Sequence, residues 1–133
     1  MIAKRRSKHA PGTFSKSALA SLREGAILRI RAGDRPHRFI GIWMVVVRGR
    51  LFVRSWSLKP RSWWRTFRSE PRGEILVAGR TMAIRAVHTR SEKIKDAVSR
   101  AYLEKYGAGA SLSYARDLGR ARSRATTTEL VPA

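Results

Sequence analysis

The stretch Phe39-Ile-Gly-Ile-Trp-Met-Val-Val-Val-Arg-Gly-Arg-Leu-Phe-Val-Arg-Ser-Trp56 decides the fold class. Its first half, residues 39–47, is apolar on both faces of an extended chain, which is typical of a buried strand. Arg48-Gly49-Arg50 supplies the turn, and residues 51–56 return as a second strand. We therefore predict a long central hairpin. The apolar run is about half of the roughly 20 residues that a membrane-spanning helix needs, so no membrane span is expected.

Further strands are predicted on both sides of this hairpin. A second hairpin has arms at residues 74–78 and 81–88 around Gly79-Arg80, because β-branched and apolar residues fill both arms. Residues 26–32 alternate between apolar and polar side chains and predict a half-buried strand that a turn at residues 33–36 ends. Residues 125–131 have the composition of a last strand. The total is six strands of mostly antiparallel character.

Helices are expected between these strands. Helix caps and apolar residues at helical spacing predict three of them, at residues 15–23, 60–69 and 91–107. Residues 108–124, which are rich in Gly, Ala, Ser and Arg, are predicted to form a loop. A sheet closed on itself has no exposed edges. The expected fold is therefore α+β, a six-stranded, mostly antiparallel split β-barrel with peripheral helices.

The length of the chain predicts one domain. It has 133 residues and a mass of 15.0 kDa, which is the usual size of a single core. Residues 1–14 are basic with little to bury, so we expect a flexible arm there and a single split-barrel domain over residues 15–133. The chain has no cysteine, which excludes disulfides and thiol nucleophiles. No signal peptide is recognisable, so a cytoplasmic location is expected.

The charge of the chain is strongly positive. Lys and Arg number 29 against nine Asp and Glu, for a formal net charge of +20. Phosphate groups, nucleic acid and an anionic membrane surface all fit such a charge, and so does a solvated basic surface without a partner.

Side-chain catalysis has little support in the sequence. The three histidines lie far apart, and none has the spacing of a metal site, so no metal is expected. There is no Gly-x-Ser-x-Gly motif, and the nearest acid–imidazole pair, Asp34 with His37, is explained by a turn. The carboxylates are scattered singly, which disfavours paired acid–base catalysis. The phosphate-binding lysine motif of nucleoside triphosphatases is absent as well.

One segment is dense in groups that bind ligands. Residues 54–68 carry three Trp and five cations where a strand becomes a helix. Backbone N–H groups at that junction would face a phosphate, and hydroxyl and cationic side chains would add donors. Exposed indoles would cover a planar ring. The alternative is that Trp63, Trp64 and Phe67 bury the helix on the barrel while the arginines face water.

A resemblance to a known group rests on this segment and its surroundings. Ser55 stands at the strand end, Lys59 and Pro60 in the loop, and Trp63-Trp64-Arg65-Thr66-Phe67 in the helix, with Ile75-Leu-Val-Ala-Gly79 in the next hairpin. In these features, within residues 26–131, the chain resembles the FMN-binding split barrels, the pyridoxamine-phosphate-oxidase-like superfamily. Within that group it is similar to an uncharacterised small bacterial family that is distantly similar to deazaflavin-dependent nitroreductases.

The resemblance implies a cofactor, FMN or a deazaflavin, lying across the barrel of a homodimer. Its phosphate would be held by Arg38, Ser55 and Lys59, and its ring would lie near Trp56 and Trp63. The complete expected cofactor-binding set is Arg38, Arg54, Ser55, Trp56, Lys59, Arg61, Trp63 and Trp64. Such proteins use the cofactor for hydride transfer without essential acidic side chains. The resemblance therefore implies an oxidoreductase.

Two alternatives remain open at the level of sequence. The first is a non-enzymatic nucleic-acid-binding protein that uses its basic surface and exposed tryptophans. The second is a split barrel that has lost its cofactor and persists as a homodimer. In any dimer, the apolar faces of the hairpin at residues 39–47 and of the helix at residues 91–106 are expected to be buried.

Overall fold

The computed structural model describes residues 12–33, 38–57, 59 and 62–133. Its elements follow the order α1 (Lys16–Glu24), β1 (Leu28–Ala32), β2 (Ile40–Ile42), β3 (Met44–Val47), β4 (Arg50–Val53), α2 (Trp63–Ser69), β5 (Arg72–Val77), β6 (Arg80–His88), α3 (Glu92–Tyr106), a 3-10 turn (Gly109–Ser111), α4 (Leu112–Asp117), α5 (Ala121–Arg124) and β7 (Thr128–Pro132). Four predicted features lie outside the described residues: residues 1–11 of the arm, the turn residues 34–36, the Asp34–His37 pair, and Pro60 with Arg61.

The described strands form one antiparallel sheet in the order β2-β1-β5-β6-β7-β4-β3. The two strands at the ends of this order, β2 and β3, are joined through Trp43 alone. A single residue cannot cross an open sheet, so the two ends lie together and the sheet curls into a nearly closed barrel. The α+β, barrel-like prediction is confirmed, with seven strands where six were expected.

The additional strand arises because residues 39–47 do not form one strand. Ile40–Ile42 pairs with β1, whereas Met44–Val47 pairs with β4 at the other end of the sheet order. Two tyrosines of α3 bond the backbone at the break. The Tyr102 hydroxyl donates to the Trp43 carbonyl at 3.1 Å, and the Tyr106 hydroxyl accepts from the Met44 N–H at 3.2 Å. These bonds satisfy backbone groups that a continuous ladder would have paired.

Both predicted hairpins form, and the turn of the second lies at Ala78-Gly79, one residue before the predicted Gly79-Arg80. Val47 pairs with Arg50 around Arg48 and Gly49, whose φ angles are 55° and 74°. Positive φ at both central residues is the type I′ geometry that matches the twist of the strands. The second hairpin places Ala78 and Gly79 in the same conformation, at 53° and 78°.

The core lies on both faces of the β3–β4 hairpin, as its apolar sequence predicts. The cluster inside the barrel includes Leu51 and Val53 together with Ile84. The second cluster includes Phe52 and packs the outer face of the hairpin against Val98 and Tyr102 of α3. Neighbouring residues of β4 therefore face opposite clusters, which follows from the alternation of side chains along a strand.

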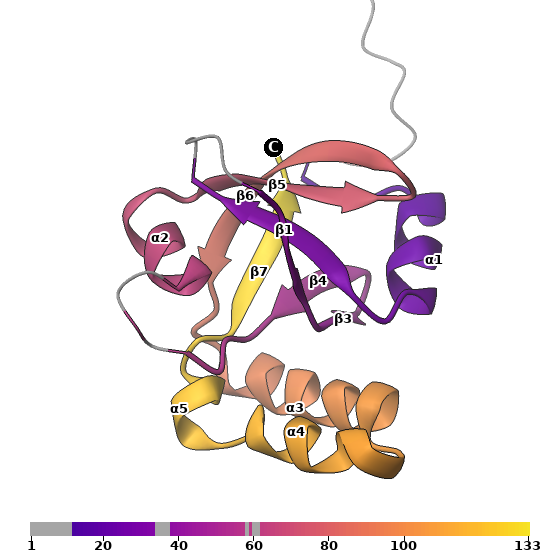
Figure 1. Ribbon diagram of the computed structural model, residues 1–133, viewed down its shortest axis with the longest axis vertical. Coiled ribbons are helices and arrows are strands. Elements are labelled where there is room, and N and C mark those ends of the chain that lie inside the picture. The colour runs from indigo at the N-terminus through magenta and orange to yellow at the C-terminus, as the bar shows by residue number, and fades with distance from the viewer. Residues whose placement is uncertain (1–11, 34–37, 58, 60–61) are drawn as a thin grey trace, which may run out of the picture.

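Helices cover the sheet on three sides (Figure 1). α3 and α4 lie together below it, while α1 and α2 flank it. The three predicted helices form, with Ser15 and Ser91 as N-caps of α1 and α3 as predicted. α2 begins at Trp63 with Ser62 as its N-cap, later than the predicted start at Pro60. The loop predicted at residues 108–124 is wrong, because two short helices form there. They are stabilised by the burial of Ala115 and Leu118 rather than by any strong local pattern.

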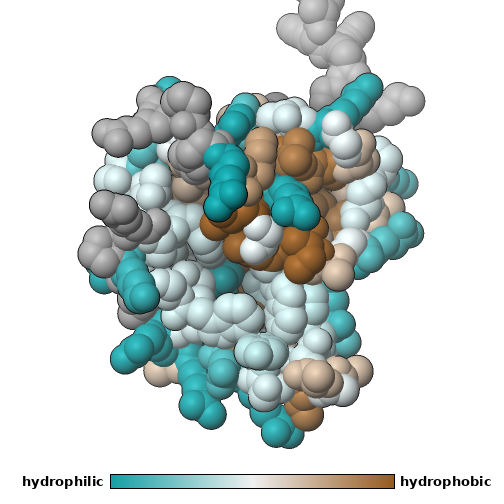
Figure 2. Space-filling view, viewed as in Figure 1, coloured by the Kyte–Doolittle hydropathy of each residue, from teal (hydrophilic) through white to brown (hydrophobic). Residues whose placement is uncertain are grey.

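Part of the exposed apolar surface lies over the sheet. Figure 2 shows apolar side chains gathered there between hydrophilic ones. The exposed large hydrophobic residues include Ile27, just before β1, and Ile40 in β2. The homodimer stays a prediction. Residues 12–14 of the expected arm are described, and Phe14 among them is buried in the barrel cluster. No helix within the described ranges is long and apolar enough to cross a membrane.

Candidate functional site

Arg54 lies at the end of β4 with only 3% of its surface exposed. Its Nε donates to the Thr127 hydroxyl, Nη1 to the Ser99 hydroxyl and the Leu118 carbonyl, and Nη2 to the Lys95 carbonyl, each at 2.8 Å. Burial lowers the pKa of the guanidinium to about 10, so it stays charged at neutral pH. Four of its five N–H groups are used within the protein. Arg54 therefore links the end of β4 to α3, to Leu118 after α4 and to Thr127 before β7.

Ser55 and Lys59 follow in the segment that leaves β4. The Ser55 hydroxyl donates to the Ser57 carbonyl at 2.7 Å and accepts from the Ser57 N–H at 3.1 Å, which closes a local turn. Lys59 is exposed, and its backbone N–H donates to the Ser57 hydroxyl. The serine of the expected phosphate site is thus engaged in the turn, while the lysine points outward.

Trp56 and Trp63 belong to two separate aromatic groups. Trp56 is 49% exposed, with its ring centroid 5.7 Å from that of Trp43. Trp63 packs against the barrel cluster and the edge of Phe67. This placement of Trp63 agrees with the alternative drawn from the sequence, in which its side chain packs α2 against the barrel. Arg38 is exposed before β2 and does not line the pocket beside α2.

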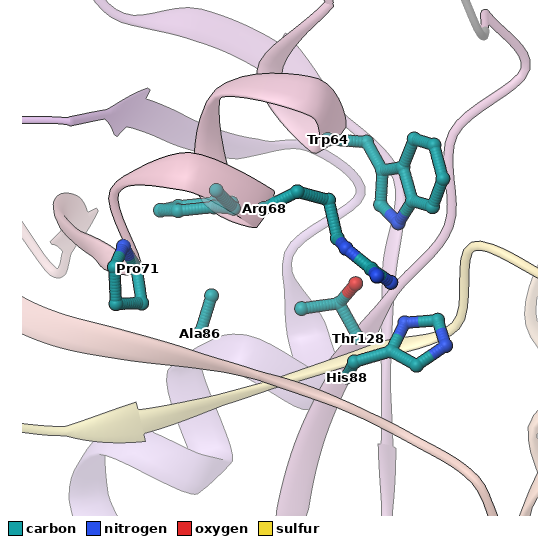
Figure 3. A pocket seen from close by; sticks show the side chains of 7 residues that line it. Trp64, Arg68, Pro71, Ala86, His88 and Thr128 are labelled. Carbon is teal, nitrogen blue, oxygen red and sulfur yellow. The ribbon is translucent and has the colours of Figure 1, made fainter.

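A pocket of about 220 Å³ lies between α2 and the ends of β6 and β7. Its lining residues are Trp64, Phe67, Arg68, Pro71, Ala86, His88 and Thr128. The strands bring two of them together, since His88 pairs with Thr128 in the sheet. Figure 3 shows the Arg68 side chain reaching from α2 toward His88, with the indole nitrogen of Trp64 facing the same space. The Arg68 guanidinium lies 5.7 Å from the Trp64 ring centroid.

Two buried polar atoms at this pocket have no hydrogen-bond partner among the described residues: Trp64 Nε1 and His88 Nδ1. An unpaired buried polar atom is costly, so it marks a place where a ligand or water would bind. The indole N–H is a donor only, whereas the imidazole nitrogen donates or accepts according to its tautomer. Together with the Arg68 guanidinium, the pocket offers several donors to one acceptor-rich ligand.

The pocket is electrostatically positive. The pKa of His88 is lowered from its ordinary value by burial and then by the charges of Arg68, Lys95 and Arg90. His88 is therefore neutral at neutral pH, and the charge at the pocket comes from the arginine. No carboxylate is among the residues that line this pocket. Such a lining favours an anionic ligand.

Of the eight residues predicted for the site, this pocket contains Trp64 alone. Arg54, Ser55 and Trp56 lie at the end of β4, and Arg61 lies outside the described residues. Sequence reasoning missed Arg68, His88 and Thr128. Arg68 was visible as a cation on the polar side of a predicted helix, but nothing local indicated that β6 and β7 would end beside it. No three His, Asp or Glu side chains within the described ranges come together as a metal site.

Residues 17–130 match the family model of an uncharacterized protein conserved in bacteria, DUF2255. The chain belongs to this family. The match runs from the second residue of α1 into β7, so the DUF2255 model spans β1 to β6, the start of β7 and all residues that line the α2 pocket. No curated protein matches the sequence.

A solved structure supports the fold of this DUF2255 chain. The chain is similar to the conserved hypothetical protein Rv2991 from Mycobacterium tuberculosis, with a TM-score of 0.57 and 13% sequence identity. The similarity covers 96% of this chain and 85% of that protein. At this identity the similarity concerns the fold, and the chemistry of the pocket has to be argued from the residues themselves.

Proposed function

We propose that this protein binds a flavin-type cofactor, FMN or a deazaflavin, in the pocket between α2 and β6–β7 and acts as an oxidoreductase. The observation that carries the proposal is the pair of unpartnered buried atoms, Trp64 Nε1 and His88 Nδ1, beside the Arg68 guanidinium. The resemblance of residues 26–131 to the FMN-binding split barrels supplies the identity of the cofactor. The barrel-like fold is compatible with this resemblance and with a cofactor bound at the pocket.

The residues of the pocket fit part of such a cofactor. A flavin edge carries carbonyl oxygens and ring nitrogens, and its tail carries a phosphate. These are acceptors for the Trp64 N–H and the Arg68 guanidinium. The pocket volume of about 220 Å³ is below the range of about 300–1,000 Å³ that encloses ligands of this size. One end of the cofactor would enter the pocket, and the remainder would lie across its mouth.

The protein groups would bind and tune the cofactor, which supplies the hydride-transfer chemistry when bound. Arg68 places a fixed positive charge at the pocket and favours negative charge on the bound group. His88 is neutral at neutral pH, and in the tautomer that carries its proton on Nε2 it can accept a proton at Nδ1. The indole of Trp64 fixes orientation by donating its N–H. No acidic side chain of the lining is required.

The proposal is tested by titrating the full chain with FMN and with a 5-deazaflavin while following tryptophan fluorescence, at roughly 150 mM salt to screen nonspecific charge. We expect saturable quenching by one of them. Arg68→Ala should weaken that binding roughly 10- to 150-fold, since a hydrogen bond to a charged group contributes about 1.5–3 kcal/mol. Arg80→Ala is the matched control, because it removes the same charge from the exposed β5–β6 turn.

Two outcomes would reject the cofactor site. One is quenching that salt abolishes and that a short DNA reproduces, which reports only the +20 charge. The other is equal loss of affinity in Arg68→Ala and Arg80→Ala.

The oxidoreductase activity is tested separately, by adding NADPH without oxygen to the complex and following the visible absorbance of the cofactor. Reduction no faster than that of free cofactor would leave a binding protein without this activity.

A further inference from the structure

A second group of aromatic side chains is exposed on the molecule, away from the α2 pocket. Trp56, in the segment after β4, is 49% exposed, and Tyr114 of α4 is 55% exposed. Their ring centroids lie 5.6 Å apart with an angle of 66° between the planes. Neither residue belongs to the two core clusters. We call this pair the aromatic surface.

The aromatic surface rests on a rigid base. Trp43 lies beneath it, 5.7 Å from Trp56 and 6.4 Å from Tyr114 between centroids. Trp43 is itself stacked on Tyr106 at 4.0 Å with the planes 2° apart. The Tyr106 hydroxyl donates to the Ala26 carbonyl at 2.8 Å, which anchors that ring to the sheet. Rings held in place this way lose little entropy when a ligand binds.

The segments that carry these rings are also fixed to each other. The Ser55 N–H donates to the Thr126 hydroxyl at 2.8 Å, and Arg54 bonds the Leu118 carbonyl at the end of α4. Figure 1 shows the chain leaving β4 beside α5 and α4, below the sheet. The exposure of Trp56 and Tyr114 is therefore a feature of well-supported backbone. Exposed aromatic residues in such a position indicate a binding surface.

Charge on the same elements selects the kind of partner. Arg116 lies on α4 with Tyr114, Lys59 follows Trp56 by three residues, and Arg122 lies on α5. All three are exposed, and none forms an ion pair within the described residues. The whole chain carries +20. The partner that complements this charge is anionic.

We infer that the aromatic surface of Trp56 and Tyr114 binds single-stranded nucleic acid by base stacking, with exposed cations of the same segments and of α5 holding the phosphates. A nucleic acid strand repeats phosphates along its length together with planar rings that stack on tryptophan and tyrosine. A duplex keeps its bases stacked inside, so a single strand is the form that these rings can contact. This inference does not depend on the cofactor proposed for the α2 pocket.

The experiment compares two labelled probes by fluorescence anisotropy: oligothymidine of about 12 nucleotides, within the usual site size, and an abasic strand of equal length. Both carry the same phosphates, but only the first has bases. At roughly 150 mM salt we expect at least tenfold tighter binding of oligothymidine. Trp56→Ala and Tyr114→Ala should each remove most of this preference and leave abasic binding unchanged. Trp56→Phe should retain part of it.

Leu103→Ala is the matched control, since Leu103 is an exposed apolar residue of α3 that is 43% exposed and carries no ring. It should bind both probes as the wild type does. Equal affinity for the two probes, or a preference that survives in Trp56→Ala and Tyr114→Ala, would overturn the inference. So would a Trp56-dependent dimer in sedimentation without base preference, because the surface would then bind a second copy. Near-UV circular dichroism of each variant confirms that it is folded.

Discussion

Arg54 shows how a residue that looks like a ligand group in the sequence serves the fold instead. Its guanidinium bonds two hydroxyls and two carbonyls supplied by α3, by Leu118 directly after α4 and by Thr127 directly before β7. In the sequence it is one of five cations beside three tryptophans. Buried charges are retained only where their hydrogen bonds are satisfied. The distinction depends on groups that lie at least 41 residues away.

We expect Arg54→Met to lower the free energy of unfolding by about 3 kcal/mol, because it removes the donor of four hydrogen bonds, two of them buried, while keeping much of the side-chain volume. Urea unfolding followed by circular dichroism measures this change. Arg85→Met, on the exposed side of β6, is the control and should change stability by less than about 0.5 kcal/mol. Equal effects of the two substitutions would contradict the structural role of Arg54.

His88 makes the proposed cofactor binding dependent on pH. Its pKa in the folded protein lies below the ordinary value, so the imidazole is neutral at pH 7. A bound anion favours the protonated form, and binding therefore takes up a proton. We expect the affinity for FMN, relative to that of His88→Gln, to rise as the pH falls from about 7 to about 5.5. A constant ratio between the two proteins would exclude His88 from the site.

The same lowered pKa has the opposite effect on the protein without ligand. The unfolded chain binds a proton at His88 more readily than the folded protein does. Stability is therefore lost as the pH falls through the unfolded value of about 6.5. Tighter binding together with lower stability of the free protein is the combined signature of this histidine.

At the scale of elements, the break between β2 and β3 depends on α3. The Tyr106 hydroxyl contacts the Ala26 carbonyl at 2.8 Å and the Met44 carbonyl and N–H at 3.1 and 3.2 Å. Burial raises the pKa of Tyr106 to about 12, so it stays protonated and able to donate throughout the neutral range. One side chain thus bridges the chain before β1 and the start of β3. It replaces the ladder that a continuous strand would have made.

We expect Tyr106→Phe to lower the free energy of unfolding by about 1–3 kcal/mol. The substitution removes the hydroxyl that bonds Ala26 and Met44 and leaves buried backbone groups unpaired. Tyr102→Phe is the comparison, since its hydroxyl makes one bond, to the Trp43 carbonyl, and should cost about 1 kcal/mol. Chemical denaturation of both variants gives the two values. A larger loss in Tyr102→Phe would show that the seam is held by packing rather than by the Tyr106 hydroxyl.

At the scale of the whole molecule, the net charge of +20 opposes the compact state. Salt screens this repulsion, so we expect the melting temperature to rise by about 4 °C, equivalent to about 1 kcal/mol, between roughly 20 and 300 mM NaCl. Differential scanning calorimetry measures the shift. A melting temperature that falls with salt would mean that the ion pairs, such as Arg50–Glu129 and Arg124–Asp96, outweigh the repulsion.

Much of the fold could be predicted locally, and most of the site could not. The turn at Arg48-Gly49 and the cap at Ser91 are properties of a few adjacent residues. The short helices at residues 112–124 lack a strong local signal and depend on burial against α3. Trp64 is the predicted site residue that lines the α2 pocket, and the helix that carries it was predictable from local sequence. No local pattern showed that the ends of β6 and β7 would lie opposite this helix.

The sequence alone therefore determined the strongly basic character of this protein, its α+β class, the two hairpins and the capped helix α3. Each of these depends on composition or on the conformational preferences of neighbouring residues. The tertiary structure decided the break at Trp43, the burial of Arg54 and the meeting of Trp64, Arg68 and His88 at one pocket. These depend on contacts between distant residues, such as the bond between Tyr106 and Met44 across 62 positions, and no local preference encodes such a contact.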